Sequence, residues 1–320
     1  MTGPPFAARP VLLDTDIGSD VDDALALGLV LSAPEALRLV TVSTLSGDAA
    51  LRARIAARLL AIGGRSDVEV FVGEREPLLR RGRFSWFGHE GKALAPGPLA
   101  PVREEPAAER IVRAAREEDG LEIVAIGPMT NLARALALDP ELPSRVAGLT
   151  IMGGHIRRVA IGSTVFAPGI DYNLCSDPEA SLAVLGAGFA TTLVPADVTL
   201  TTWMGAADVD ALAAGGPLAR ALAALVRLWA PVQRDLFTGL GGEMDPDNQA
   251  FLHDPLTVLA LLAPSALGFE RLRIVPTIEG GVLRTLEVAQ ALGIGTAMRV
   301  ATSVDAHAAR RAIVERLTRG

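Results

Sequence analysis

Short runs of aliphatic and β-branched residues recur along the chain as far as about residue 195, and most are followed by an Ala/Leu/Arg-rich stretch with helical spacing. Strands are predicted over residues 10–14, 37–43, 68–72, 121–126, 149–152 and 190–195. Helices are predicted over residues 22–32, 51–63 and 107–118. Strands that alternate with helices in this way indicate right-handed crossovers. The predicted fold class is therefore α/β, with an open, mostly parallel sheet flanked by helices.

The pattern continues without an internal repeat, a low-complexity segment or a linker. Residues 1–320 are therefore predicted to form a single domain with a Rossmann-like core. An Ala/Leu-rich region around residues 200–250 is predicted to be a helix-rich excursion from the sheet.

Polar residues repeatedly follow the ends of the predicted strands. They lie at Asp14 and Asp16 and in the stretches 43–48, 127–131, 153–155 and 196–199. In an open parallel sheet, ligands bind at the carboxyl ends of the strands. Five loops that are separate in sequence are therefore expected to form one site.

Five aspartates lie close together after the first predicted strand. They are Asp14, Asp16, Asp20, Asp22 and Asp23. In the simplest interpretation, Asp22 caps the following helix and the others are solvated loop residues. A cap accounts for one or two carboxylates, but not for Asp14 and Asp16 directly after an apolar strand. Hard oxygen ligands on one loop suit Ca²⁺ or Mg²⁺.

The aspartate loop does not have the spacing of an EF-hand. Gly18 stands where a ligand is required, and Leu25 stands in place of the closing glutamate. A cation bound here would therefore need further ligands from elsewhere in the fold.

An apolar strand that ends in Asp-x-Asp is also typical of phosphatases of the haloacid dehalogenase type. In that alternative Asp14 would be the nucleophile. Such a site also requires a later lysine, and Lys92 is the only lysine in the chain. Lys92 lies in FGHEGKALAPG, which does not have the pattern of a helix start.

Seven motifs carry a more specific resemblance. They are LLDTDIGSDVDDALAL (12–27), VFVGEREPL (70–78), VAIGPMTNLARAL (124–136), IMGGHI (151–156), DYNLCSDPEAS (171–181), PADVT (195–199) and HDPLTVLA (253–260). In this order they resemble the motifs of the nucleoside hydrolases, the inosine-uridine preferring family of N-ribohydrolases. The resemblance runs from Val11 to about Leu262. The aspartate motif resembles a longer variant of the family's signature, and Asp20 lies in the extension without an assigned role.

The resemblance implies a nucleoside hydrolase-like fold with one Ca²⁺ ion in the site. By motif position, the protein ligands of the ion would be Asp16, Asp23, the main-chain carbonyl of Ile126, and Asp254. Carboxylates and a carbonyl suit the large, flexible coordination shell of Ca²⁺. Asp16 would also take a proton from the attacking water as general base. His253 would reach the nucleobase and protonate or polarise it as it leaves.

The resemblance also implies a set of ribose contacts. By motif position, these residues are Asp22, Asp48, Met152, Asp171, Asn173 and Asp254. Asp48 stands where the family usually has asparagine, and Asp171 stands where it usually has glutamate. The segment 157–170 lacks a clear equivalent of the Gly-Asn pair that helps to bind the 5′ end of the sugar. The exact glycoside is therefore left open, and a modified ribose is conceivable.

Other residues near the expected site are assigned by their sequence context. Asp14 is expected to support the loop from behind the ligands. His89, in FGHEG, resembles the family's His-Gly loop only loosely, and its role stays open. His155 and His307 are interpreted as structural.

The base-recognition helix is expected near residues 227–255. Trp229 and Phe237 could stack on a base. Aromatic residues at helical spacing belong more often to the core, and the core is favoured for Trp229. Trp203 and Trp86 are left undecided, and no purine or pyrimidine preference follows from the sequence.

Composition and charge limit the partners. A net charge of −7 and a pI of about 5.2 argue against nucleic-acid binding. A membrane span would need about 18 uncharged apolar residues in a row, and the sequence has no such run. The N-terminus lacks the pattern of a secretory signal and Cys175 is the single cysteine, so a cytoplasmic location is expected. The resemblance implies a homodimer or homotetramer.

The leading hypothesis is Ca²⁺-dependent hydrolysis of the N-glycosidic bond of ribonucleosides, in nucleoside salvage or catabolism. The products would be a free nucleobase and ribose. Two alternatives stay open on the sequence: the phosphatase that uses Asp14, and a non-catalytic nucleoside- or sugar-binding protein on the same scaffold.

Overall fold

A computed structural model of the chain describes residues 8–79, 88–169 and 171–319. The strands are β1 (Arg9–Thr15), β2 (Leu37–Thr44), β3 (Glu69–Val72), β4 (Val102–Arg103), β5 (Glu122–Ala125), β6 (Gly148–Met152), β7 (Val159–Ile161), β8 (Thr164–Phe166), β9 (Thr191–Val194), β10 (Trp203–Met204), β11 (Ala250–Phe251), β12 (Leu267–Glu279), β13 (Val282–Val288) and β14 (Thr296–Val304). The six strands predicted from sequence are confirmed to within one or two residues at each end.

The helices are α1 (Asp22–Leu31), α2 (Ala49–Ile62), α3 (Ala107–Glu117), α4 (Thr130–Leu138), α5 (Leu142–Arg145), α6 (Tyr172–Ser176), α7 (Pro178–Gly186), α8 (Ala196–Thr199), α9 (Ala206–Ala213), α10 (Pro217–Gly239), α11 (His253–Leu262) and α12 (Ala306–Arg319). Helices α9 and α10 form the helical region expected around residues 200–250. In the described part of the chain, no helix combines the length and the apolar character that a membrane span requires.

The main sheet has ten strands in the order β13-β12-β14-β9-β6-β5-β1-β2-β3-β4. From β14 to β4 every neighbouring pair is parallel, whereas β12 pairs antiparallel with both β13 and β14. The predicted α/β class with a mostly parallel sheet is therefore confirmed. Because the chain adds β2, β3 and β4 on one side of β1 and then returns to β5 on the other, the strand order reverses between β1 and β5. Such a switch point is where an open α/β sheet binds its ligand.

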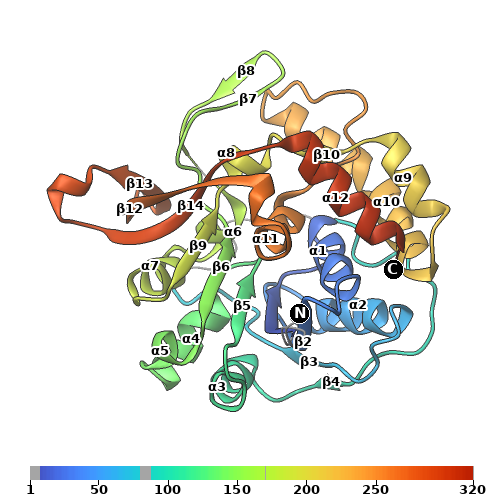
Figure 1. Cartoon of the computed structure of the whole chain (residues 1–320), viewed down its shortest axis with the longest axis horizontal. Coiled ribbons are helices and arrows are strands. Elements are labelled where there is room, and N and C mark those ends of the chain that lie inside the picture. The colour runs from blue at the N-terminus through green and yellow to red at the C-terminus, as the bar shows by residue number, and fades with distance from the viewer. Residues whose placement is uncertain (1–7, 80–87, 170, 320) are drawn as a thin grey trace, which may run out of the picture.

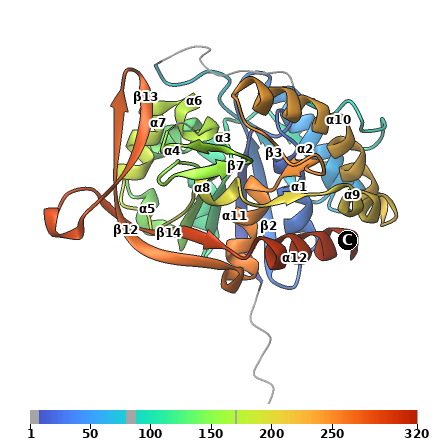
Figure 2. The ribbon, with the colours of Figure 1, turned by 90° about the horizontal axis from the view of Figure 1, so that it is seen from above.

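Helices cover both faces of the sheet (Figure 1). On one face the core contains side chains of α1, α2, α10, α11 and α12, and on the other face it contains side chains of α3, α4 and α7. Helices α9 and α10 lie outside α1 and α2 (Figure 2). The strands that cross the middle of the sheet are buried on both sides; the last five residues of β1 are all buried. This explains why these strands appear in the sequence as continuous apolar runs.

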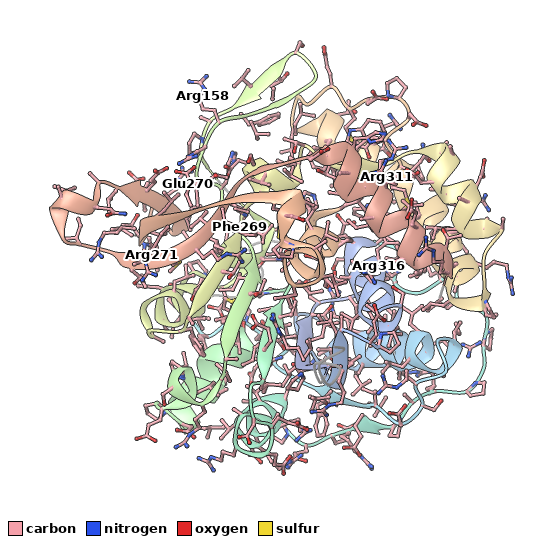
Figure 3. All side chains as sticks on the ribbon, in the orientation of Figure 1. Arg158, Phe269, Glu270, Arg271, Arg311 and Arg316 are labelled. Atoms are coloured by element: carbon pink, nitrogen blue, oxygen red, sulfur yellow. The ribbon has the colours of Figure 1, made fainter. Side chains whose placement is uncertain are left out.

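Strands β12 and β13 form a hairpin that extends from the end of the sheet (Figure 1). Phe269, Glu270 and Arg271 lie on β12 (Figure 3), and Glu270 accepts a hydrogen bond from Arg157, which precedes β7. The hairpin is thus tied to the segment 157–169, which contains the small β7–β8 hairpin.

Candidate active site

The aspartate loop, residues 16–21, connects the carboxyl end of β1 to the N-terminus of α1. Gly18 has φ +123°, a conformation that suits glycine. Asp22 and Asp23 form the first turn of α1, and both are buried. The partial positive charge at a helix N-terminus favours carboxylates in this position.

Asp254 completes the cluster from the N-terminus of α11. Helices α1 and α11 pack side by side (Figure 1), and the backbone N–H of Asp254 donates to Oδ2 of Asp22 over 3.3 Å. One carboxylate oxygen from each of Asp22, Asp23 and Asp254 lies within 4.8 Å of the other two. Oδ1 of Asp254 is buried and has no hydrogen-bond partner among the described residues. A buried acceptor of this kind calls for a ligand.

The pKa values of the clustered carboxyl groups also favour a bound ligand. Burial raises the pKa of Asp22, Asp23 and Asp254 well above its ordinary value, and repulsion from neighbouring aspartates raises it further. Burial also raises the pKa of Asp16 to about 6, although the nearby Arg52 guanidinium lowers it. A cation among these oxygens would offset both burial and repulsion. The donor set therefore fits a hard divalent cation.

The carbonyl of Ile126 lies directly after β5, next to the aspartate loop. Nδ2 of Asn173 donates to this carbonyl over 3.0 Å and to the Met152 carbonyl over 3.2 Å. A Cβ atom at Gly127 would lie 2.8 Å from Oδ1 of Asp16, so the glycine allows the Asp16 carboxylate to approach the end of β5. Thus Asp16, Ile126, Met152 and Asn173 lie together, as the sequence predicted for a common site.

Asp14 lies behind the aspartate loop. Its Oδ1 accepts hydrogen bonds from Ser43 of β2 over 2.5 Å and from Asn131 of α4 over 2.8 Å. Its side chain is fully buried, and burial raises its pKa to about 7. Through Oδ1 the carboxylate joins β1 to β2 and α4, whereas its buried Oδ2 has no hydrogen-bond partner among the described residues. A supporting role for Asp14 stays a prediction.

His253 begins α11 beside the carboxylate cluster. Its Nδ1 lies 2.6 Å from Oγ1 of Thr199, and its ring centroid lies 5.4 Å from that of Phe251. Phe237 of α10 in turn lies 4.8 Å from Phe251, centroid to centroid. Burial lowers the pKa of His253 to about 4, so the free protein holds a neutral imidazole at neutral pH. A row of rings thus runs from His253 through the buried Phe251 to Phe237, within the region where base recognition is predicted.

His89 packs against the aspartate loop. Its backbone N–H donates to the Ser19 carbonyl over 3.3 Å, and the next residue, Glu90, donates to Gly18 over 2.8 Å. The side chain is fully buried, and its Nε2 has no hydrogen-bond partner among the described residues. His89 is therefore close to the site, although a substrate contact is still a prediction.

Two predicted ribose contacts are also helix caps. Asp48 is exposed, and its carboxylate accepts from the backbone N–H of Leu51 to cap α2. Asp171 is buried and accepts from Leu174 to cap α6. Burial raises the pKa of Asp171 to about 6. Capping explains why these positions carry aspartate, and their contact with a substrate stays a prediction.

Several other residues named from sequence lie outside the cluster. Trp229 is buried in the core, as predicted, and Trp203 lies under the Arg310 guanidinium. His155 is buried near Asp197, and His307 lines a surface hollow against α9. Trp86 lies outside the described residues.

Arg52 of α2 is the principal site residue that the sequence analysis missed. Its guanidinium donates to the Asp16 carbonyl, to the Ser46 carbonyl over 2.7 Å and to Oγ of Ser19 over 2.7 Å. Thr15, whose hydroxyl donates to Asp23, was also missed. Arginines are frequent in the helical stretches of this chain, so the pattern alone gave no signal for Arg52.

Comparisons with known proteins identify the family of the chain. The family model of the inosine-uridine preferring nucleoside hydrolases matches residues 11–311. The chain is 34% identical to the pyrimidine-specific ribonucleoside hydrolase RihA of Enterobacter sp. (strain 638) over 265 residues, 80% of each chain. It is 30% identical to a probable uridine nucleosidase 2 of Arabidopsis thaliana, over 97% of each chain.

Solved structures share the whole architecture. A plant nucleoside hydrolase superposes with a TM-score of 0.82 at 26% identity, covering 98% of this chain and 99% of its own. A purine-preferring ribonucleoside hydrolase from Gardnerella vaginalis gives a TM-score of 0.80 at 23% identity, covering 97% and 98%. The chain belongs to the inosine-uridine preferring nucleoside hydrolase family.

Proposed function

We propose that this protein hydrolyses the N-glycosidic bond of ribonucleosides with the help of a bound Ca²⁺ ion and releases a free nucleobase and ribose. The observation that carries the proposal is the buried convergence of Asp22, Asp23 and Asp254 at the carboxyl edge of a nucleoside hydrolase fold. The unpartnered oxygen of Asp254 supports a cation among them.

The ligands proposed for the ion are Asp16, Asp23, the Ile126 carbonyl and Asp254. Ca²⁺ fits because all four donors are oxygens and because three of them belong to buried carboxylates that otherwise repel one another. When bound, the ion would lower the pKa of the attacking water and help to hold two ribose hydroxyls. Asp22 belongs to the same close trio of carboxylates, and we assign it to the ribose hydroxyls.

The residues of the chain would then act as follows. Asp16 takes the proton of the water that attacks C1′ from the face opposite the base, and the configuration at C1′ is inverted. The surrounding carboxylates stabilise the positive charge that develops on the ribosyl group. Asp22 and Asp254 accept hydrogen bonds from ribose hydroxyls, so deoxyribonucleosides would be poor substrates. His253 protonates or polarises the base that leaves.

The test is a reducing-sugar assay on a panel of nucleosides. Because the relatives are named for pyrimidine nucleosides and uridine, uridine and cytidine come first, followed by inosine, guanosine and adenosine. Ribose release is expected from at least one of them, with loss of activity on chelation and recovery with Ca²⁺. Asp16→Asn is expected to lower kcat by on the order of 100-fold or more.

The panel also decides between the alternatives. Nucleoside and Ca²⁺ binding without turnover would favour a non-catalytic binding protein. Phosphate release that needs Mg²⁺ and Asp14 would favour a phosphatase, which the hydrogen bonds of Asp14 to Ser43 and Asn131 argue against. From the family resemblance we further propose a homodimer or homotetramer, which light scattering on the purified protein would measure.

A further inference from the structure

Asp20 lies in the extension of the aspartate motif, and its side chain is fixed by the loop. Its Oδ1 accepts hydrogen bonds from the backbone N–H groups of Val21, over 2.5 Å, and Asp22, over 3.4 Å. This local arrangement, in which an aspartate bonds the backbone one and two residues on, holds the carboxylate in one direction. The side chain is only partly buried, so a ligand can reach it.

The direction is towards the ribose and base contacts proposed above. One carboxylate oxygen of Asp20, one of Asp22 and a ring nitrogen of His253 all lie within 4.8 Å of one another. Asp22 is assigned to the ribose and His253 to the base. Asp20 therefore lies where the sugar of a nucleoside joins its base. The hydrogen bond between Thr199 and His253 and the packing of Phe251 against the imidazole restrict its movement.

We propose that Asp20 determines base preference by accepting a hydrogen bond from the edge of the nucleobase next to the glycosidic bond. The inference rests on the proposed function of the site. Burial raises the pKa of Asp20 to about 7, so the test below is made at pH 8, where the carboxylate is mostly ionised, accepts hydrogen bonds and cannot donate one. The base edge that faces Asp20 must therefore present an N–H group.

The requirement for an N–H group on this edge distinguishes nucleobases that are otherwise similar in size and shape. Uracil carries an N–H at N3, beside the O2 atom that adjoins the glycosidic nitrogen, whereas cytosine has an unprotonated N3 at the same place. Guanine carries an amino group beside N3, whereas hypoxanthine has only a C–H there. Asp20 thus favours uridine over cytidine and guanosine over inosine. A carboxylate facing the N3 lone pair of cytosine would be left unpaired, and unpaired buried acceptors discriminate strongly.

The test measures kcat/KM for the two pairs in the wild-type protein, Asp20→Asn and Asp20→Ala. In the wild type, we expect uridine to exceed cytidine, and guanosine to exceed inosine, by about tenfold or more. Asparagine keeps an oxygen for the Val21 and Asp22 N–H groups and presents an amide N–H₂ in place of the second carboxylate oxygen. Both ratios are therefore expected to fall to about 1 or below in Asp20→Asn, and to about 1 in Asp20→Ala.

Asp119→Asn is the matched control, because Asp119 is exposed in the turn before β5, at the opposite edge of the sheet. It should leave both ratios unchanged. Ratios near 1 in the wild type, or ratios that Asp20→Asn leaves intact, would overturn the proposal. If no nucleoside is cleaved, the proposed hydrolysis fails instead. The Kd ratios of the same pairs, measured by calorimetry with Ca²⁺ present, then decide the role of Asp20 on their own.

Discussion

Asp14 shows how a single buried carboxylate links this site to the stability of the chain. Burial raises its pKa to about 7 in the folded protein, whereas the ordinary value is 3.8. Between these two values the folded state holds a proton that the unfolded state has released. The contribution of Asp14 to the stability of the metal-free protein is therefore fully present below about pH 4 and is lost as the pH rises towards 7.

Asp14→Asn tests this linkage. The amide keeps an oxygen for Ser43 and Asn131 but cannot ionise. In chelator, the unfolding free energy of the wild type is expected to fall between pH 4 and 7 by an amount on the order of 4 kcal/mol from Asp14. The unfolding free energy of Asp14→Asn should fall less over the same pH range. Urea unfolding at several pH values measures this difference. If the unfolding free energy depended equally on pH in Asp14→Asn, in the wild type and in Asp119→Asn, the result would contradict a raised pKa of Asp14 in the folded protein.

At the scale of elements, helix α2 holds the aspartate loop in place through Arg52. One guanidinium reaches two carbonyls and one hydroxyl, on Asp16, Ser46 and Ser19. Its charge also lowers the pKa of Asp16 and Asp23. A planar fork with several fixed donors is something that lysine cannot supply.

Arg52→Lys should therefore keep the charge and lose the geometry. Ca²⁺ affinity and kcat/KM are expected to fall by about 10- to 100-fold, as is usual for residues that orient metal ligands. Calorimetric titration of Ca²⁺ measures the first quantity and ribose release the second. Arg54→Lys, on the exposed face of the same helix, should match the wild type. If both variants bind Ca²⁺ like the wild type, Arg52 does not position the loop.

The elements that were predicted from the sequence are those whose burial restricts the types of residue that they can contain. Strands buried on both faces must be apolar, so β1, β5 and β6 are visible as continuous runs. The β12–β13 hairpin was not predicted, because its pattern mixes exposed, intermediate and buried positions and its pairing is antiparallel. The short β10–β11 pair joins residues 203–204 to 250–251. Local pattern does not specify such a distant pairing.

The site residues also divide into those that the sequence predicted and those that it did not. The aspartates that follow the apolar strand were predicted as site residues, because a ligand or a reaction is needed to account for their mutual repulsion. Asp254 was predicted from the motif HDP. Arg52 and Thr15 could not be identified, because their importance arises from the packing of α2 against the loop and from the turn of the chain after β1. Sequence thus showed the groups that carry charge, and structure added those that hold them.

At the scale of the whole molecule, the site lies at the joint between the two halves of the sheet. Asp16 and Asp23 follow β1, the Ile126 carbonyl follows β5, and Asp254 lies in the first turn of a helix far along the chain. The site therefore exists only when both halves have assembled. Since one continuous sheet carries the cores on both of its faces, we expect the chain to unfold as a single cooperative unit.

Ca²⁺ should therefore stabilise the entire fold by mass action. A ligand that binds only the folded state adds about 2.7 kcal/mol at 100 times its Kd. Calorimetric scans should show one transition whose Tm rises by several degrees with Ca²⁺ and returns to its starting value in chelator. Asp254→Asn removes the charge of a proposed ligand in the first turn of α11, so its Tm should respond far less to Ca²⁺, and Asp119→Asn should respond like the wild type. Two separate transitions would show that the halves fold independently, and an equal Ca²⁺ response in Asp254→Asn would place the ion elsewhere.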